Sequence, residues 1–201
     1  MKFDEKEIID GCINNEVPAQ NRLFNRFAPK MMGICYRYMQ TIYEAEDVLQ
    51  EAFIKVFKHL HTFQYNSSLE HWIRRIVVNT ALNHIKANKK FRNELDTENL
   101  EDEGYTDSIH MQFDTEEVIH AIKSLPEGYR TVFNLYAIEG YSHKEIGEML
   151  GVTESTSKSQ YSRARKQIQF MLEKNNRLNQ NQLHTTTKSY TVYNEVPKIS
   201  L

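Results

Sequence analysis

Residues 141–166 read YSHKEIGEMLGVTESTSKSQYSRARK, and their pattern is the most specific in the chain. Ser142 followed by Glu145 is a capping-box pattern, which predicts a short helix that ends at Gly151. Thr153 can cap a second helix, and Gly151 allows the left-handed turn that swings this helix across the first. A short capped helix, a glycine turn and a longer basic helix together predict a helix-turn-helix.

The second helix of this motif is expected to expose small hydroxyl side chains and basic side chains. Small residues let a backbone approach a DNA groove, while Lys and Arg reach phosphates or guanine edges. A helical hairpin with a solvated basic face is the structural alternative. We interpret the motif as a reader of duplex DNA, with Ser155, Thr156, Lys158, Ser159, Ser162 and Arg163 as its candidate contacts.

Apolar residues also recur at three-to-four spacing in three segments before residue 92, which predicts three helices there. A short helix over residues 5–17 is expected to end before Pro18. Such helices close a core only by packing on one another, and the small number of glycines and prolines (7 and 4) argues against a turn-rich β fold.

The third of these helices carries a second candidate site. At about 100° per residue, the stripe opposite its apolar face holds an aromatic, two amides and several cations. The aromatic can stack on a base, the amides can read base edges and the cations can follow a backbone, which suits unpaired nucleic acid. Burial of a lone Trp in the core is the alternative. The stripe consists of Trp72, Arg75, Asn79, Asn83, Lys86 and Lys90, and the polar loop before it, residues 65–68, is a candidate pocket for an extruded base.

A third motif, EAEDVLQEAFIKVFKHL, occupies residues 44–60. One face of this helix is apolar and the other is charged. Acids near its start and bases near its end agree with the helix dipole, so helix stabilisation explains much of the pattern. A protein-docking face is the sharper interpretation, and periodicity does not separate the two.

The net charge is only −2, but the charges are segregated along the chain. Residues 72–92 carry bases and no acid, whereas residues 93–114 carry acids and no Lys or Arg. We therefore predict an all-α protein with two small helical domains, the second a helix-turn-helix, joined by a flexible acidic linker. The predicted parts are residues 1–92, the linker 93–114, residues 115–174, and a polar tail 175–201 without fixed structure, which has some strand character at 187–192.

Several classes of protein do not fit this sequence. Cys12 and Cys35 cannot form a disulfide scaffold or a zinc site, and unpaired thiols suit a reducing cytoplasm. There is no signal-peptide pattern and no apolar run long enough to cross a bilayer. There is also no HExxH, CxxC or phosphate-binding loop motif. We expect a cytoplasmic protein without enzymatic activity, cofactor, metal or direct membrane insertion.

Taken together, the three motifs and their order resemble an extracytoplasmic-function (ECF) sigma factor of the bacterial sigma-70 type. The resemblance covers residues 21–90 and 119–172, and its most specific parts are EAEDVLQEAFIKVF, HWIRRIVVNTALNHIK and the run that begins SLPEGYRTVFNLY. It implies a non-catalytic factor that binds core RNA polymerase, directs it to promoter DNA and melts that DNA. It also implies control by an anti-sigma factor.

The resemblance assigns roles to three groups of residues. It implies that Asp47, Gln50 and Glu51 dock on the clamp of the polymerase β′ subunit. It implies that Trp72, Ile76, Asn79 and Asn83 recognise and melt the minus-ten element, and that Lys158, Ser159, Ser162 and Arg163 read the minus-thirty-five duplex. The chain departs from the family pattern at Leu69, Ser157 and Gln160, where Phe, Val and Arg are frequent.

Two other functions remain open on the sequence. A helix-turn-helix regulator of duplex DNA that never touches polymerase would leave the Trp72 stripe without a task. A helical adaptor that binds no DNA would bind its partner without salt dependence and would lose nothing on Arg163→Ala.

Overall fold

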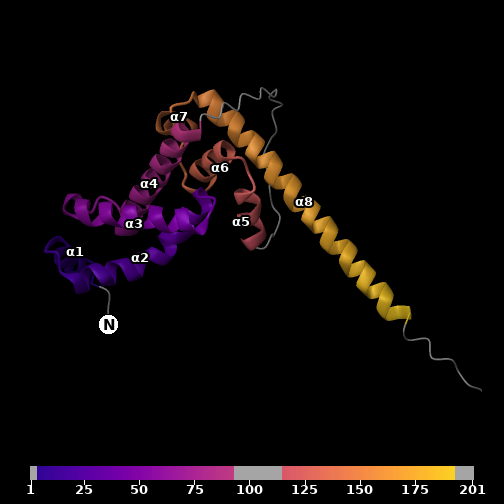
Figure 1. The fold of residues 1–201 in the computed structure, drawn as a ribbon, viewed down its shortest axis with the longest axis horizontal. Coiled ribbons are helices and arrows are strands. Elements are labelled where there is room, and N and C mark those ends of the chain that lie inside the picture. Colours follow the sequence, from indigo (N-terminus) through magenta and orange to yellow (C-terminus); the bar gives the residue numbers. More distant parts are fainter. Residues whose placement is uncertain (1–3, 93–114, 193–201) are drawn as a thin grey trace, which may run out of the picture. The chain divides into compact units, whose positions relative to one another are not determined.

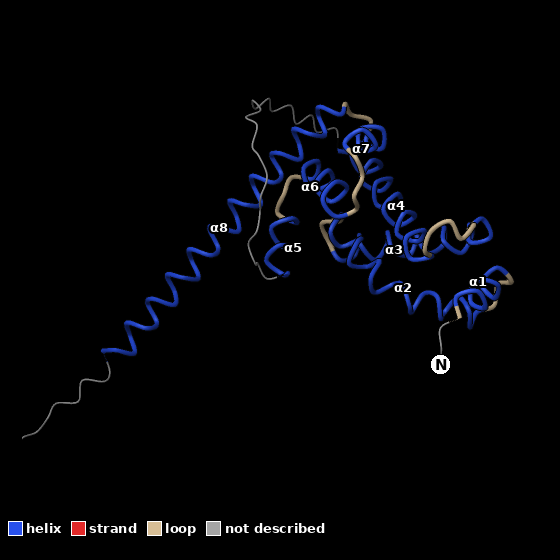
Figure 2. The backbone as a smooth tube through the Cα atoms, turned by 180° about the vertical axis from the view of Figure 1, so that it is seen from behind, coloured by secondary structure: helices blue, strands red, loops and turns tan. Residues whose placement is uncertain are grey.

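The computed structural model describes residues 4–92 and 115–192, and these residues form helices and short connecting loops without any strand (Figures 1 and 2). The chain divides into two compact units, Met1–Asp102 and Glu103–Leu201. The prediction of an all-α protein with two helical parts is confirmed, while the predicted acidic linker, residues 93–114, lies outside the described residues. Within the described parts, no helix is both long and apolar enough to cross a membrane.

The first unit is a small helical bundle (Figure 1). Helix α2 packs on α3 and α4, α3 packs on α4, and α1 packs on α2. Its most deeply buried side chains come from all three long helices, with Leu23, Val48 and Val77 fully shielded from solvent. In chain order its elements are α1 (Glu5–Ile13), α2 (Val17–Tyr38), α3 (Ile42–His59), the 3₁₀ turn η1 (Leu60–Thr62) and α4 (Leu69–Arg92).

Local signals explain where these helices begin and end. Thr41 and Glu44 form a capping box at the start of α3, with each side chain bonded to the other residue's backbone N–H. Helix α1 ends at Ile13, earlier than predicted, and Asn15 then turns the chain with φ 60°. Pro18 lies in the first turn of α2, where its missing N–H removes no helical hydrogen bond.

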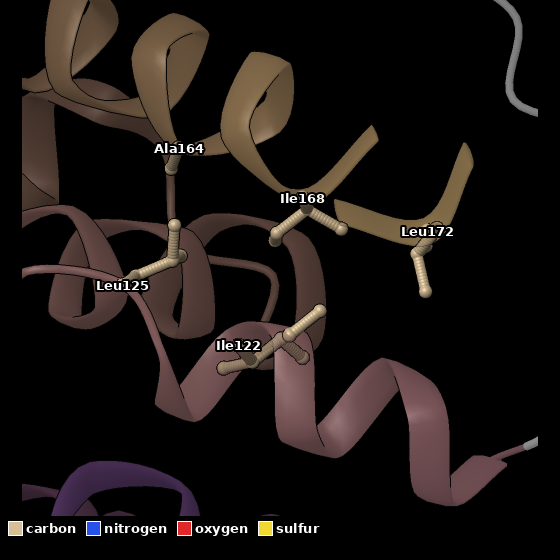
Figure 3. Close-up of a cluster of buried hydrophobic side chains, with 6 residues drawn as sticks. Ile122, Leu125, Ala164, Ile168 and Leu172 are labelled. Atoms are coloured by element: carbon tan, nitrogen blue, oxygen red, sulfur yellow. The ribbon is translucent and has the colours of Figure 1, made fainter. Parts of the chain in front are cut away.

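The second unit is built around one long helix. Helix α8 packs against α5, α6 and α7. Figure 3 shows Ile122 and Leu125 pointing toward Ala164, Ile168 and Leu172 of α8, and all five side chains are buried. The elements of this unit are α5 (Thr115–Lys123), α6 (Glu127–Phe133), the π-helical turn η2 (Asn134–Ile138), α7 (His143–Leu150) and α8 (Glu154–Val192).

Helix α8 is longer than the sequence predicts. The sequence predicts that this helix ends near residue 174 and that the tail 175–201 has no fixed structure, with strand character at 187–192, but the helix continues to Val192. Residues 193–201 of the predicted tail lie outside the described residues. The physical reason is that residues 154–192 contain neither glycine nor proline, so nothing interrupts the helical hydrogen bonds.

Candidate nucleic-acid interface

The stripe predicted on α4 lies on the surface of the first unit. Arg75, Asn79, Asn83 and Lys86 are exposed, and Trp72 and Ile76 are half-buried. Lys90 lies on the last turn of α4, where the side chains are not described. Among the described residues, no hydrogen bond engages the side-chain amides of Asn79 and Asn83. The two amides are therefore available to a ligand that approaches this face.

Trp72 is not a core residue. The opposite face of α4 fills the core with Ile73, Val77 and Ala81, none of which is accessible to solvent. The indole of Trp72 instead contacts the ring of Phe63, with 5.6 Å between the ring centroids. Full burial of Trp72 in the core, which was the alternative interpretation of this residue, is thereby excluded, because the indole keeps an accessible surface beside the amides.

Helix α4, which carries the stripe, begins at Leu69, directly after its cap at Ser68. The Ser68 hydroxyl accepts a hydrogen bond of 3.2 Å from the His71 backbone N–H, as an N-terminal cap does. The buried side chain of Leu69, one of the positions where the chain departs from the pattern it resembles, anchors the first turn in the core. The Ser68 cap and the buried Leu69 together fix the residue at which α4 begins. They therefore also fix the position on the helix surface of Trp72 and of the stripe residues that follow it.

The face predicted for docking lies on α3. Asp47, Gln50 and Glu51 are all exposed. Lys55 donates a hydrogen bond of 2.6 Å to the Glu51 carboxylate and one of 3.3 Å to the Thr80 hydroxyl, which in turn donates to the Ile76 carbonyl at 2.9 Å. One ammonium group thus connects the charged face of α3 with the helix that carries the Trp72 stripe.

The helix-turn-helix forms as predicted. The Ser142–Glu145 capping box starts α7, and Gly151 ends it in the left-handed conformation with φ 72°. A Cβ atom added at Gly147 would lie 2.8 Å from the Val152 carbonyl oxygen. Because that distance is too short for any side chain, Gly147 lets α7 approach the turn closely and sets the angle at which α8 leaves it.

The predicted reading residues occupy the first turns of α8. Ser155 and Lys158 are exposed, while Thr156, Ser159, Ser162 and Arg163 are half-buried. Three of the six already have a local partner. The Thr156 N–H and hydroxyl contact the capping Thr153, Ser159 donates to the Thr156 carbonyl at 3.0 Å, and Lys158 pairs with Glu154 at 2.7 Å. A ligand would have to displace these contacts or share them.

The sequence pattern does not predict a cluster of aromatic and histidine rings that packs against α8. Tyr136, in the middle of the π-helical turn, stacks on the His143 ring with 4.1 Å between centroids, and both rings contact Tyr161 of α8. A 3.0 Å hydrogen bond joins His143 Nδ1 to the fully buried hydroxyl of Ser157. The departure from Val at position 157 was the available signal. A buried hydroxyl requires such a partner.

The environment of His143 favours its neutral form. Burial lowers the pKa of the imidazole, the Lys158 ammonium lowers it further, and the Glu154 carboxylate acts in the opposite direction. The buried thiols of Cys12 and Cys35 have pKa values raised to about 11 and about 12, mainly by burial. Among the described residues, no three His, Cys, Asp or Glu side chains are grouped to hold a metal ion.

Two family models match the two units separately. Residues 23–91 match sigma-70 region 2, and residues 115–168 match sigma-70 region 4. The first match contains the charged face of α3 and the stripe on α4. The second contains the helix-turn-helix and the cluster behind it.

Curated relatives align along most of the chain. The ECF RNA polymerase sigma factor SigW of Bacillus subtilis is 31% identical over 159 residues, which are 73% of this chain and 84% of that protein. The RNA polymerase sigma-H factor of Pseudomonas aeruginosa is 28% identical over 177 residues, 82% and 91% of the two chains. The sigma factor RpoE of Bartonella quintana, solved in complex with the anti-sigma factor NepR, aligns with TM-score 0.49 and 20% identity over 76% of this chain and 96% of its own. With both regions matched in order and a relative above 30% identity aligned over most of its length, the chain belongs to the ECF family of RNA polymerase sigma factors.

Proposed function

We propose that this chain binds core RNA polymerase, directs it to promoters and opens the promoter DNA so that transcription starts. Sigma factors are initiation factors, and the polymerase performs the synthesis. The chain therefore acts without a catalytic site of its own, in the bacterial cytoplasm where polymerase and chromosome meet. The family resemblance also implies an anti-sigma factor as the regulatory partner.

The observation that carries this proposal is the surface of α4. Trp72, Arg75, Asn79 and Asn83 share one accessible face, and the two amides are not engaged with other described residues. An aromatic beside free amides and cations fits unpaired bases, which stack on rings and offer their edges for hydrogen bonds. A regulator that binds only duplex DNA has no use for this face. We assign it to recognition and melting of the minus-ten element.

The first turns of α8 fit the minus-thirty-five duplex. Lys158 and Arg163 supply charge for phosphates or guanine edges, and Ser155, Thr156, Ser159 and Ser162 are small enough for the helix to enter a major groove. Lys158 is held near the groove-facing turn by its ion pair with Glu154. The pair is exposed and weak, so exchange of Glu154 for a DNA phosphate costs little.

We assign the docking on the β′ clamp to Asp47, Gln50 and Glu51 on α3. All three side chains are exposed, and Gln50 and Glu51 lie one helical turn after Asp47 on the same face of α3. The carboxylates of Asp47 and Glu51 favour a basic partner surface. Glu51→Lys is expected to weaken co-purification with core polymerase, whereas a charge change outside this face, at Glu7 of α1, serves as the matched control.

The decisive experiment is transcription with the purified full chain, core polymerase of the host bacterium, and a library of randomised promoter DNA. Sequencing of the RNA products yields the promoter that the chain selects. We expect products that depend on both elements. If the chain binds duplex DNA tightly but yields no promoter-dependent RNA, the polymerase-independent regulator is correct instead. Salt-insensitive partner binding without any DNA affinity would favour the helical adaptor.

The selected promoter then permits a test of the α4 face. Asn79→Ala is expected to impair opening of matched duplex more than it impairs duplex binding, because the amide reads a base that is exposed only after melting. Permanganate footprinting of matched and pre-melted templates measures this difference. Asn25→Ala, an exposed amide on α2, is the matched control and should leave opening unchanged. Equal defects of Asn79→Ala on both templates would contradict the assignment.

A further inference from the structure

The turn of α8 that we assign to DNA reading is held from behind by one polar contact. Ser157 lies between Thr156 and Lys158, and its side chain is fully buried. A 3.0 Å hydrogen bond joins its hydroxyl to Nδ1 of His143, the first residue of α7. Position 157 is also one at which the chain departs from the pattern it resembles, where Val is frequent. The two helices of the motif are therefore joined by a polar contact at a position that an apolar side chain often fills.

The imidazole of His143 is itself held by two aromatic rings. Tyr136 stacks on it, with 4.1 Å between the ring centroids and 7° between the planes, and Tyr161 contacts it at a centroid distance of 5.7 Å. Tyr136 comes from the π-helical turn η2, and such turns are rare and frequent at functional sites. Tyr161 lies one helical turn after Ser157, so the His143 ring contacts two successive turns of α8.

A hydrogen bond constrains α8 in a way that an apolar contact does not. Hydrogen bonds weaken steeply as their angle departs from linearity, whereas apolar attraction has no preferred direction. Val at position 157 would tolerate a small rotation or translation of α8, but the Ser157 hydroxyl meets His143 Nδ1 in one register only. Fixing register is the best-attested use of a buried polar contact. Because Thr156 and Lys158 flank Ser157, its register is also theirs.

We propose that His143 is a positioning residue for recognition of the minus-thirty-five element: through Ser157 it fixes the rotation and depth of the first turns of α8. The inference rests on the proposed function and adds that base selectivity depends on a contact behind the reading surface. Hydrogen bonds to base edges carry the sequence information, whereas phosphate contacts carry none directly. Loss of the contact should therefore lower selectivity among duplexes more than it lowers overall affinity.

The test measures selectivity by gel-shift titration of the full chain. The probes are the minus-thirty-five duplex selected in the transcription experiment and duplexes with one substituted base pair each. His143→Phe keeps a ring beside Tyr136 but removes the hydrogen bond, and the preference for the selected duplex should fall roughly tenfold, the worth of one base contact. His143→Asn removes the ring but keeps a polar atom bonded to Cγ, as Nδ1 is, and should retain the native preference to within about twofold.

A double variant separates positioning from stability. His143→Phe alone leaves the buried Ser157 hydroxyl without a partner, which lowers the melting temperature in itself. Combining it with Ser157→Ala replaces both partners by apolar groups, so the melting temperature should recover while selectivity stays low. Thr131→Val is the matched control, because it removes a hydrogen bond of 2.7 Å from the buried Thr131 hydroxyl to the Glu127 carbonyl within α6. It should lower the melting temperature and leave selectivity unchanged.

Three results would overturn the inference. If the double variant regains native selectivity together with its melting temperature, the contact serves stability alone. If His143→Phe weakens binding of all duplexes by the same factor, the contact does not position the base-reading side chains. In both cases the proposed function stands. If the native holoenzyme makes no promoter-dependent RNA, the proposed function and the positioning role are both wrong.

Discussion

Because α7 approaches its turn closely at Gly147, replacing glycine by alanine is expected to have opposite effects on stability at Gly147 and at Gly33. At Gly147 an added Cβ would meet the Val152 carbonyl at 2.8 Å, whereas at Gly33, exposed on α2, it would meet no atom within 4 Å apart from its chain neighbours and the backbone of its own helix. Replacing a helical glycine by alanine ordinarily stabilises a protein by about 0.5–1 kcal/mol. Gly33→Ala is therefore expected to stabilise the first unit by that amount.

At Gly147 the same gain is outweighed by the clash. The nearest atom is the backbone carbonyl oxygen of Val152, not the end of a movable side chain, so either α7 or the turn must shift, and forced repacking of this kind costs about 1–3 kcal/mol. The expected net effect of Gly147→Ala is a destabilisation of about 1–2 kcal/mol. For a unit of this size the corresponding fall in melting temperature is about 5–10 °C.

Differential scanning calorimetry of the full chain measures both changes. The transition of the second unit should move down in Gly147→Ala, and the transition of the first unit should move up in Gly33→Ala. The displaced turn should also weaken binding of minus-thirty-five duplex by Gly147→Ala. A rise in the melting temperature of Gly147→Ala would refute the argument, because it would mean that the turn has room for a methyl group.

The remaining predictions concern single groups. Ser157→Ala removes the partner of His143 Nδ1 and should destabilise the second unit by about 1 kcal/mol, measured by thermal unfolding, because the imidazole is left half-buried without its hydrogen bond. The lowered pKa of His143 means that the unfolded chain binds a proton more readily than the folded one, so the second unit should lose stability as pH falls from 7.5 to 5.5. His143→Gln should show a smaller loss over that interval, and an identical pH profile would contradict the assignment. Lys158→Ala and Arg163→Ala should each weaken binding of the selected minus-thirty-five duplex in gel-shift titrations, and each should flatten its dependence on salt by about one unit of slope. The thiol of Cys35, with its pKa raised to about 12, should react with Ellman's reagent at pH 8 only as fast as the first unit opens. Immediate reaction in the native state would show that the thiol is accessible.

Much of the helix-turn-helix could be predicted from sequence because its signals are local. The capping box of Ser142 and Glu145, the left-handed Gly151 and the Thr153 cap each depend on residues within a few positions of one another. The helical periodicity before residue 92 likewise predicted which face of α4 is buried. Exposure of the amides on the other face followed from the same periodicity, whereas the roles assigned to them stay predictions.

Features set by distant contacts could not be predicted in this way. The π-helical turn places Tyr136 against His143 and Tyr161, which come from two later helices. The left-handed backbone of Tyr65, with φ 57°, belongs to the short loop between η1 and α4 and does not follow from the residue's own preference, which is for extended structure. The length of α8 was underestimated because a polar composition was read as absence of structure, although nothing in residues 175–192 breaks a helix.

The shared ammonium of Lys55 has a consequence for attempts to redesign promoter choice. Because this one group bonds to Glu51 on α3 and to Thr80 on α4, an α4 transplanted from another sigma factor would keep this link only if it carries a hydroxyl at the position of Thr80. The smallest portable cassette is accordingly the α3–α4 pair, not α4 alone. Under the roles proposed for α3 and α4, a chimera that exchanges only α4 is expected to change polymerase binding together with promoter preference.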